Sequence, residues 1–197
     1  MSCPIHLAVA TMYEPISWTN SQFAKKKSGL WNLSVEIDVK KLMPTSNIDD
    51  AVAVLRSLDL RHGDLELRLS DYSVHSFHRV PTYSFRMFSQ QSAEELGQIN
   101  LRIGSTPHLE RYAGHIGYGV HRVHRGHHYA ARSVILLLPL ARRLGIDPVW
   151  ITCDPENTAS RRSLELAGAE FVEIVDVPPT CGIRKFGGKL HKCRYRI

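Results

Sequence analysis

The segment from Arg122 to Ala130 combines basic, histidine and glycine residues, and a stretch with the apolar pattern of a helix begins at its end. In that stretch, apolar residues recur at helical spacing, at Ala130, Val134, Leu137, Leu138 and Ala141. The first N–H groups of a helix have no partner within the helix, and the helix dipole is positive there. We therefore expect this loop to bind an anion, namely a phosphate or a pyrophosphate.

A short apolar run, Ile116–Val120, precedes the loop and predicts a buried strand. The loop lacks the GxxxxGK(S/T) sequence of P-loop nucleoside triphosphatases. It also lacks the GxGxxG sequence with an acidic residue about 20 positions later that is typical of dinucleotide-binding folds. These two common nucleotide sites are thus not predicted here.

The loop instead resembles the pyrophosphate-binding signature of the Gcn5-related N-acetyltransferases. That signature reads Gln or Arg, two residues, Gly, one residue, then Gly or Ala, after a strand. Arg125 and Ala130 match its ends, whereas His128 stands where the family has glycine. The resemblance implies that acetyl-CoA binds with its pyrophosphate on the backbone of Arg125, Gly126, His127, His128, Tyr129 and Ala130. It also implies coenzyme contacts from Tyr118 and Val120 in the strand.

A second segment strengthens this resemblance. The apolar run Val149–Cys153 predicts another buried strand, and a helix pattern follows it. The segment is similar to the family's Asn-x-x-Ser and Glu-x-x-Gly arrangement at Asn157, Ser160, Glu165 and Gly168. This similarity implies coenzyme contacts from Asn157 and Ser160. The similarity covers about Leu96 to Ile197, and it extends to one uncharacterised branch of predicted acetyltransferases.

The family resemblance implies an α/β (α+β) fold with a mixed central sheet flanked by helices. Its fourth and fifth strands splay apart as a parallel pair and hold the pantetheine arm of the coenzyme. Here those strands correspond to His115–Val120 and Val149–Cys153. We expect one domain over residues 1–197, with residues 1–95 forming a divergent acceptor-side half and residues 96–197 the coenzyme-binding half.

The implied activity is transfer of an acetyl group from acetyl-CoA to a primary amine of a small molecule, a peptide or a protein. The attacking ammonium must lose a proton, and relatives often carry a glutamate where this sequence has His115. An imidazole with a pKa of about 6.5 suits a general base near neutral pH. Alternatively, His115 packs against the sheet and donates one hydrogen bond.

The leaving thiolate must be protonated, and many relatives use a tyrosine seven positions after the asparagine. This sequence has Leu164 there, which leaves Ser160 as the predicted donor, or no donor at all. A thiolate with a pKa of about 8.5 leaves without much help. Asn157 has a plain alternative as a helix cap, and we expect Cys153 to be a buried, unreactive thiol.

The loop also contains four histidines, His121, His124, His127 and His128, which could suggest a metal site. The segment has no acidic or cysteine partner, and its arginines would repel a cation. We therefore predict no metal, and we expect His127 and His128 to line the phosphate loop.

Composition agrees with a globular enzyme. The chain has 197 residues, 43% hydrophobic and 22% charged, with four cysteines that lack CxxC spacing. No signal peptide is evident, and the apolar run Val134–Leu140 is too short to span a bilayer. We expect a reduced, cytoplasmic protein that has an amine-bearing acceptor and no membrane partner; a homodimer is left open.

Two alternatives remain for function. The first is a non-catalytic acyl-CoA-binding sensor of the same fold, which the departures at His128 and Leu164 favour. The second is a basic nucleic-acid-binding protein, because the net charge is +6 and the pI about 9.3. The basic residues are not interleaved with aromatic residues as in a recognisable nucleic-acid module, so this alternative ranks last.

The remaining elements follow from local patterns. A helix is predicted after Asn47, and a polar loop over Ser105–Gly114. A turn rich in proline and glycine is predicted over Pro178–Gly188. Further strands are predicted at Leu30–Leu42, Leu65–Leu69, Thr82–Phe88, Leu96–Ile103, Phe171–Val177 and Lys189–Ile197.

Overall fold

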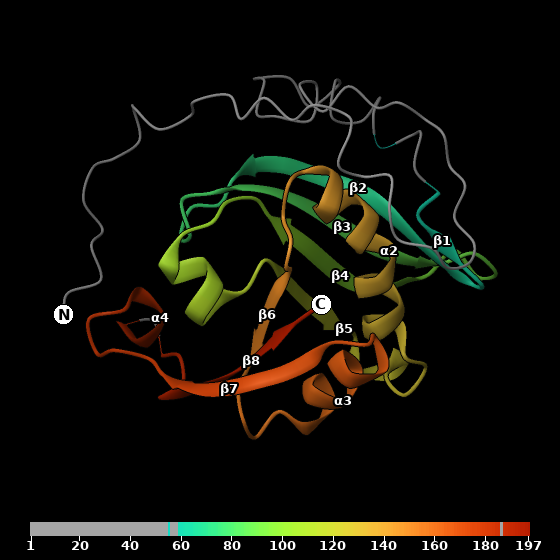
Figure 1. Ribbon diagram of the computed structural model, residues 1–197. Helices are drawn as coiled ribbons and strands as arrows, with labels where there is room; N and C mark the ends of the chain where they lie inside the picture. Colours follow the sequence, from blue (N-terminus) through green and yellow to red (C-terminus); the bar gives the residue numbers. More distant parts are fainter. Residues whose placement is uncertain (1–54, 56–58, 186) are drawn as a thin grey trace, which may run out of the picture.

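The computed structural model describes residues 55, 59–185 and 187–197 of the chain. The strand predicted at Leu30–Leu42 and the start of the helix predicted after Asn47 lie outside the described residues. Within the described part, two antiparallel sheets lie one above the other in the view of Figure 1 and share one apolar core. No helix in this part is long and apolar enough to cross a membrane.

The first sheet is five-stranded and has the order β1-β2-β3-β4-β5. Its third strand shows why these segments form strands. Tyr83, Phe85 and Met87 alternate along β3 and are each 0% exposed, so one face of the sheet is buried in the core. The strands are β1 (Arg61–His62), β2 (Leu65–Val74), β3 (Pro81–Ser89), β4 (Glu95–Arg102) and β5 (Ile116–Val120).

The second sheet is three-stranded with the order β6-β8-β7. Its strands are β6 (Trp150–Cys153), β7 (Glu170–Asp176) and β8 (His191–Arg196). The central strand β8 carries Tyr195, whose fully buried ring packs in the core. The strands predicted from the sequence for β2 to β8 are all present, with boundaries that shift by a few residues.

The two sheets meet where β5 and β6 begin. The His115 N–H donates to the Trp150 carbonyl oxygen at 2.6 Å, and the Trp150 N–H donates to His115 Nδ1 at 2.9 Å. Beyond this point β5 pairs with β4 and β6 pairs with β8, so the ladder between them ends. The expected splay is therefore present, but it divides the expected single mixed sheet into two hydrogen-bonded sheets.

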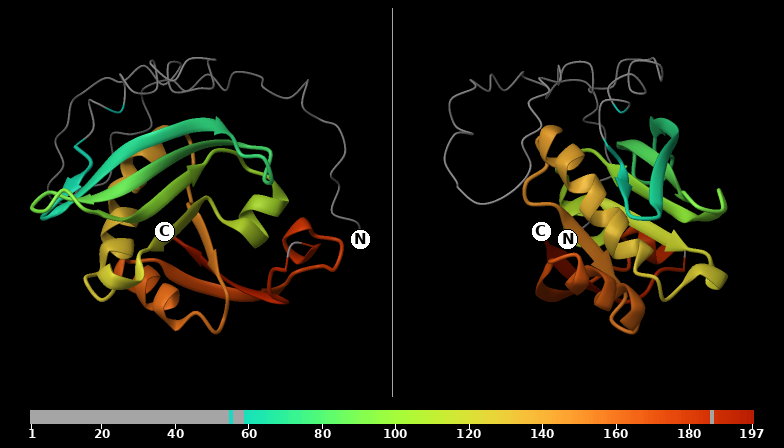
Figure 2. Two further views of the ribbon diagram at one scale, coloured as in Figure 1. Left: turned by 180° about the vertical axis from the view of Figure 1, so that it is seen from behind. Right: turned by 90° about the vertical axis from the view of Figure 1, so that its right-hand side faces the viewer.

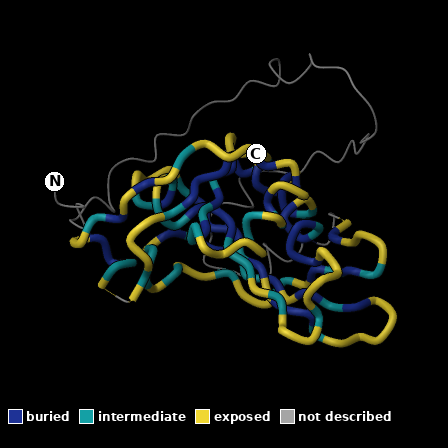
Figure 3. Tube along the Cα trace, turned by 90° about the horizontal axis from the view of Figure 1, so that it is seen from below, coloured by how far each residue is buried: buried dark blue, intermediate teal, exposed yellow. Residues whose placement is uncertain are grey.

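Helices cover the sheets and fix the loops. α2 (Tyr129–Arg143) packs against β2, β4 and β5, with Val134, Leu137 and Leu140 fully buried. α3 (Thr158–Leu166) packs against α2 and β7, near the second sheet in both views of Figure 2. Figure 3 shows the buried segments in the interior of the trace and exposed segments along its outer loops.

Three segments predicted as irregular contain short helices, and one of them is the predicted anion loop, which contains the 3-10 helical turn η3 (Arg122–His124). The predicted loop Ser105–Gly114 contains η2 (Leu109–Ala113), a π-helical turn, and the predicted turn Pro178–Gly188 contains α4 (Gly182–Lys185). Leu109 is 0% exposed and is the buried residue of η2. A turn this short has no apolar periodicity, so the sequence pattern could not reveal it.

Candidate active site

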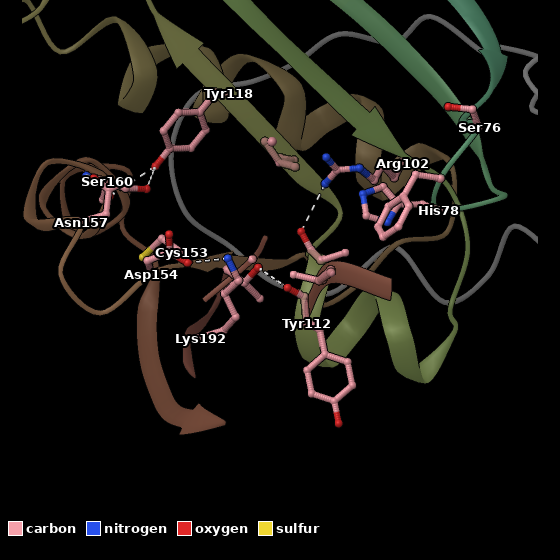
Figure 4. Close-up of a pocket in the computed structure, with 17 residues that line it drawn as sticks. Ser76, His78, Arg102, Tyr112, Tyr118, Cys153, Asp154, Asn157, Ser160 and Lys192 are labelled. Carbon is pink, nitrogen blue, oxygen red and sulfur yellow. Dashed lines mark hydrogen bonds and ion pairs between the residues drawn. The ribbon is translucent and has the colours of Figure 1, made fainter. Parts of the chain in front are cut away.

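A cleft of about 800 Å³ opens where β5 and β6 diverge (Figure 4). One wall carries Gly117 and Tyr118 of β5, and the other carries Thr152 and Cys153 of β6. α3 contributes Ser160 together with the residue before the helix, Asn157. The loops after β2 and β7 close the opposite end, so the cleft draws on both predicted halves of the chain.

The α3 end of the cleft contains a pair of hydroxyl groups. Tyr118 Oη lies 2.8 Å from Ser160 Oγ and also donates to the Ser160 carbonyl oxygen at 3.3 Å. Burial raises the pKa of Tyr118 to about 12, so the phenol keeps its proton at neutral pH. The structure thus places two of the predicted site residues together and supplies a hydroxyl that is held as a hydrogen-bond donor.

Asn157 caps α3 and lies at the cleft. Its Oδ1 accepts a hydrogen bond from the Ser160 N–H at 3.0 Å, which makes Asn157 the N-cap of α3. The residue also lines the cleft. Capping is therefore established by the contacts, and a contact with a ligand remains a proposal.

The predicted anion loop lies at the C-terminal end of β5. Arg125, Gly126, His127 and His128 are exposed, and α2 begins directly afterwards at the buried Tyr129 and Ala130. Gly126 adopts φ +91°, and no described atom lies within 4 Å of the position that a Cβ would take. His128 makes no side-chain hydrogen bond to cap α2 within the described part of the chain. The loop therefore offers open space and uncapped backbone donors to an anion.

His128 shows why the family has glycine at this position. Its backbone is left-handed, with φ 58° and ψ 20°, a conformation that costs a residue other than glycine roughly 1–2 kcal/mol. A glycine would adopt this conformation without the cost that His128 carries. Arg125 supports this geometry, because its Nε donates to the Val120 carbonyl oxygen at 3.2 Å.

The start of α2 contacts the turn of the β1–β2 hairpin, and the sequence analysis did not predict this contact. Asp64 accepts a hydrogen bond from Tyr129 Oη at 2.7 Å and forms an ion pair with Arg132 at 2.7 Å. The hydrogen bonds from Tyr129 and Arg132 hold the pKa of the Asp64 carboxyl below its usual range. A residue 65 positions away in sequence therefore fixes the first turn of the helix.

His115 has a structural role in this geometry. It is 2% exposed; its Nδ1 accepts from the Trp150 N–H, and its Nε2 lies 3.0 Å from the Gly104 carbonyl oxygen. Nε2 must therefore carry the proton and donate it to Gly104. Burial lowers the pKa of His115 and favours the neutral ring. Because neither nitrogen has a free lone pair facing the cleft, the predicted role as general base does not fit these contacts.

Leu164 and Cys153 are both buried, as was predicted for Cys153. Leu164, at the position of the family tyrosine, is 0% exposed and packs in the core, so it presents no group to the cleft. Burial raises the pKa of Cys153 to about 11, which keeps the thiol protonated.

The opposite end of the cleft contains a cation that the sequence analysis missed. Arg102 is 9% exposed, and its Nη1 donates to the carbonyl oxygens of Ala113 at 3.2 Å and Gly114 at 3.0 Å. Burial lowers the pKa of Arg102 to about 10, so the guanidinium still carries its charge at neutral pH. Arg102 is the last residue of a strand with an ordinary apolar pattern, and nothing in that pattern marks it as a site residue.

Next to Arg102 lies a chain of hydrogen-bonded side chains. His78 Nδ1 is 3.1 Å from His108 Nε2, and His108 Nδ1 is 3.5 Å from Cys181 Sγ. Burial, followed by the charge of Arg102, lowers the pKa of both rings, that of His78 to about 3. These histidines are therefore neutral, and no group of three or more ligands suited to a metal occurs in the part of the chain that the structure describes.

Comparisons with solved structures give partial likenesses. A ribosomal-protein-S5-alanine acetyltransferase from Vibrio fischeri is 15% identical, with a TM-score of 0.46 over 59% of this chain and 61% of that one. A GNAT-family acetyltransferase from Bacillus anthracis is 20% identical, with a TM-score of 0.45 over 58% and 64%. The microcin C7 self immunity acetyltransferase MccE, solved with acetyl-CoA and AMP, is 13% identical, with a TM-score of 0.45 over 59% and 60%.

This chain thus spans less than two thirds of each of these three proteins. A search of curated proteins finds no match. The family model described as the acetyltransferase (GNAT) domain matches residues 44–170, which is more than half of the chain. On that match, the chain belongs to the GNAT acetyltransferase domain family.

Proposed function

We propose that this protein transfers an acetyl group from acetyl-CoA to a primary amine. The observation that carries the proposal is the continuity of two features along β5. An uncapped helix start with an open loop follows the strand, and the cleft between β5 and β6 runs along its free edge. A pyrophosphate and the extended arm attached to it require such an arrangement.

The described residues fit the coenzyme both at the anion loop and along the cleft between β5 and β6. The N–H groups from Gly126 to Ala130 suit the pyrophosphate, with Arg125 and His127 beside them. Beyond His115, the edge of β5 that faces β6 has no strand partner among the described residues. Its N–H and C=O groups can therefore pair with the amides of the pantetheine arm. The backbone N–H near Val120 is the proposed donor to the thioester oxygen.

The chemistry requires two proton movements. The acceptor ammonium loses a proton before it attacks, and because His115 is fully engaged, we propose that water in the cleft accepts that proton. The tetrahedral intermediate then expels the coenzyme thiolate. The Tyr118–Ser160 hydroxyl pair is the proposed donor to the leaving sulfur, in place of the family tyrosine that is Leu164 here.

Isothermal titration calorimetry with acetyl-CoA and an assay of thiol release over a panel of amines test this function. We expect both binding and turnover. Binding without turnover of any amine would favour the acyl-CoA sensor, a reading that the departures at His128 and Leu164 support. Absence of binding would overturn the proposal and direct attention to nucleic-acid binding through the basic surface.

A further inference from the structure

Arg102 is a buried charge that has no counterion among the described residues. Within the described residues, its hydrogen bonds go to the carbonyl oxygens of Ala113 and Gly114, both from Nη1. Its Nε is buried and has no acceptor in that part of the chain. A buried ion without a partner is costly to the fold, because a charge that leaves water must be compensated by an opposite charge or by hydrogen bonds.

The other charged groups of the cleft do not provide this compensation. Asp154 is the acidic residue of the lining, and it forms an ion pair with Lys192. His78, also in the lining, is held neutral by burial. The described lining therefore carries one net positive charge, and that charge lies on Arg102.

The cleft wall also leaves space for the guanidinium of Arg102. Gly117 of β5 lines the cleft, and a Cβ at this position would lie 2.8 Å from Arg102 Nη2 and 3.3 Å from Nη1. The absence of a side chain at Gly117 lets the guanidinium lie across β5. In Figure 4 it points from β4 into the space between the strands, at the end opposite the Tyr118–Ser160 pair.

We propose that the Arg102 end of the cleft binds a carboxylate on the acceptor, so that the substrate is an amine that also carries a carboxylate. This inference rests on the proposed acetyl transfer and names its substrate class. A single guanidinium beside neutral histidines matches one carboxylate in charge, whereas a polyphosphate would need several cations. The carboxylate would bind at Arg102 and direct the amine toward the Tyr118–Ser160 end, where the thioester is expected.

Matched pairs of amines provide the test. Glycine, β-alanine and 4-aminobutyrate are each compared with the corresponding amide by thiol release, and the series varies the distance between amine and carboxylate. We expect one acid to exceed its amide at least tenfold in kcat/KM. In Arg102→Met the ratio should fall to near one, while Arg102→Lys should retain part of it and the acetyl-CoA affinity should stay unchanged.

Two further variants separate this effect from damage to the fold. Arg86→Met removes an exposed cation that pairs with Glu95 on the same sheet, and it should leave the acid-to-amide ratio unchanged. Gly117→Ala keeps the charge of Arg102 but displaces the guanidinium, so it should lower the ratio even if Arg102→Met does not fold.

The possible outcomes can contradict the carboxylate site without contradicting the proposed acetyl transfer. Turnover with no preference for acids, or a preference that survives in Arg102→Met, would overturn the inference and leave the acetyltransferase proposal intact. Without turnover, NMR titration of N-acetylglycine against N-acetylglycinamide still tests the carboxylate site. Equal binding of the two would overturn the inference, whereas loss of acetyl-CoA binding would overturn the proposed function.

Discussion

Two residues in left-handed backbone conformation shape the anion loop, and only one of them is a glycine. Gly126 has open space around it, so a side chain there would enter the volume proposed for the pyrophosphate. We expect Gly126→Val to raise the acetyl-CoA dissociation constant at least tenfold, about 1.4 kcal/mol, by calorimetry.

Gly145 provides the matched control for this substitution. It also has positive φ and no described atom within 4 Å of a Cβ, but it lies beyond the opposite end of α2. Gly145→Val should therefore cause a similar backbone strain without changing the dissociation constant. Equal effects of the two substitutions would show that strain alone, and not the anion site, explains the loss.

The hydroxyl pair of Tyr118 and Ser160 gives the second prediction. If the pair protonates the leaving thiolate, Tyr118→Phe should lower kcat about tenfold, since the thiolate leaves fairly well unaided. The acetyl-CoA dissociation constant should change little. Tyr112→Phe is the control, because this tyrosine borders the cleft but its ring points away in Figure 4. An unchanged kcat in Tyr118→Phe would remove the pair from the mechanism.

One buried imidazole, that of His115, bridges the junction of β5 and β6. His115→Ala leaves the Trp150 N–H and the Gly104 carbonyl oxygen without partners, so we expect a loss of about 2–4 kcal/mol in the free energy of unfolding. The kcat of the folded fraction should change less than about threefold.

His191, exposed on β8, is the control for this substitution, and His191→Ala should cost about 0.5 kcal/mol or less. Denaturant titration and steady-state assays separate stability from catalysis. A loss of about a hundredfold in kcat at unchanged stability would restore His115 as the base.

The contact of the β1–β2 hairpin with α2 should affect both the stability of the fold and the binding of acetyl-CoA. Asp64→Asn weakens the bonds to Tyr129 and Arg132, which lie in the first turn of the helix that the coenzyme loop precedes. We expect a stability loss of about 1–2 kcal/mol and a weaker acetyl-CoA affinity. Asp71→Asn, on the exposed part of β2, is the control. If the affinity stays unchanged, the hairpin does not position the coenzyme loop.

The sequence predicted the strands and the two longer helices of the second half well, because each of them has its own apolar period and its own turn signal, which the short η2 and α4 lack. The strand positions of β5 and β6 and the helix starts at Tyr129 and Thr158 follow from these local patterns. Asn157 and Ser160 were predicted together because they are close in sequence. Features fixed by distant contacts, such as the Asp64 contact with α2, have no local signature.

His115 and Arg102 show why the site was only partly predictable. A sequence places His115 at the start of a strand but does not show that both ring nitrogens are already bonded. Arg102 ends a strand with an ordinary alternation of apolar residues, and the lack of a counterion in the described part of the chain is visible only when the cleft is assembled. The role of such a residue depends on which partners surround it, and these partners are known only once the fold is known.

One buried and three half-buried histidines make the stability of the whole molecule depend on pH. Burial is the main cause that lowers the pKa values of His75, His78, His108 and His115 in the folded state. The unfolded chain, with pKa values of about 6.5, therefore binds more protons than the folded chain when the pH falls below that value. The free energy of unfolding should be constant above about pH 7 and should decrease steadily from pH 6.5 to pH 5.

Urea denaturation across pH 5–7.5 measures this decrease. The paired carboxylates do not interfere in that range, because hydrogen bonds from their partners hold the pKa values of Asp64, Glu66 and Glu95 below their usual range. Since His78 has the pKa lowered to about 3, His78→Gln should reduce the slope more than His191→Gln, which changes an exposed ring. A slope that is the same in both variants would mean that His78 is protonated in the folded state, and the cleft would then carry more positive charge than Arg102 alone supplies.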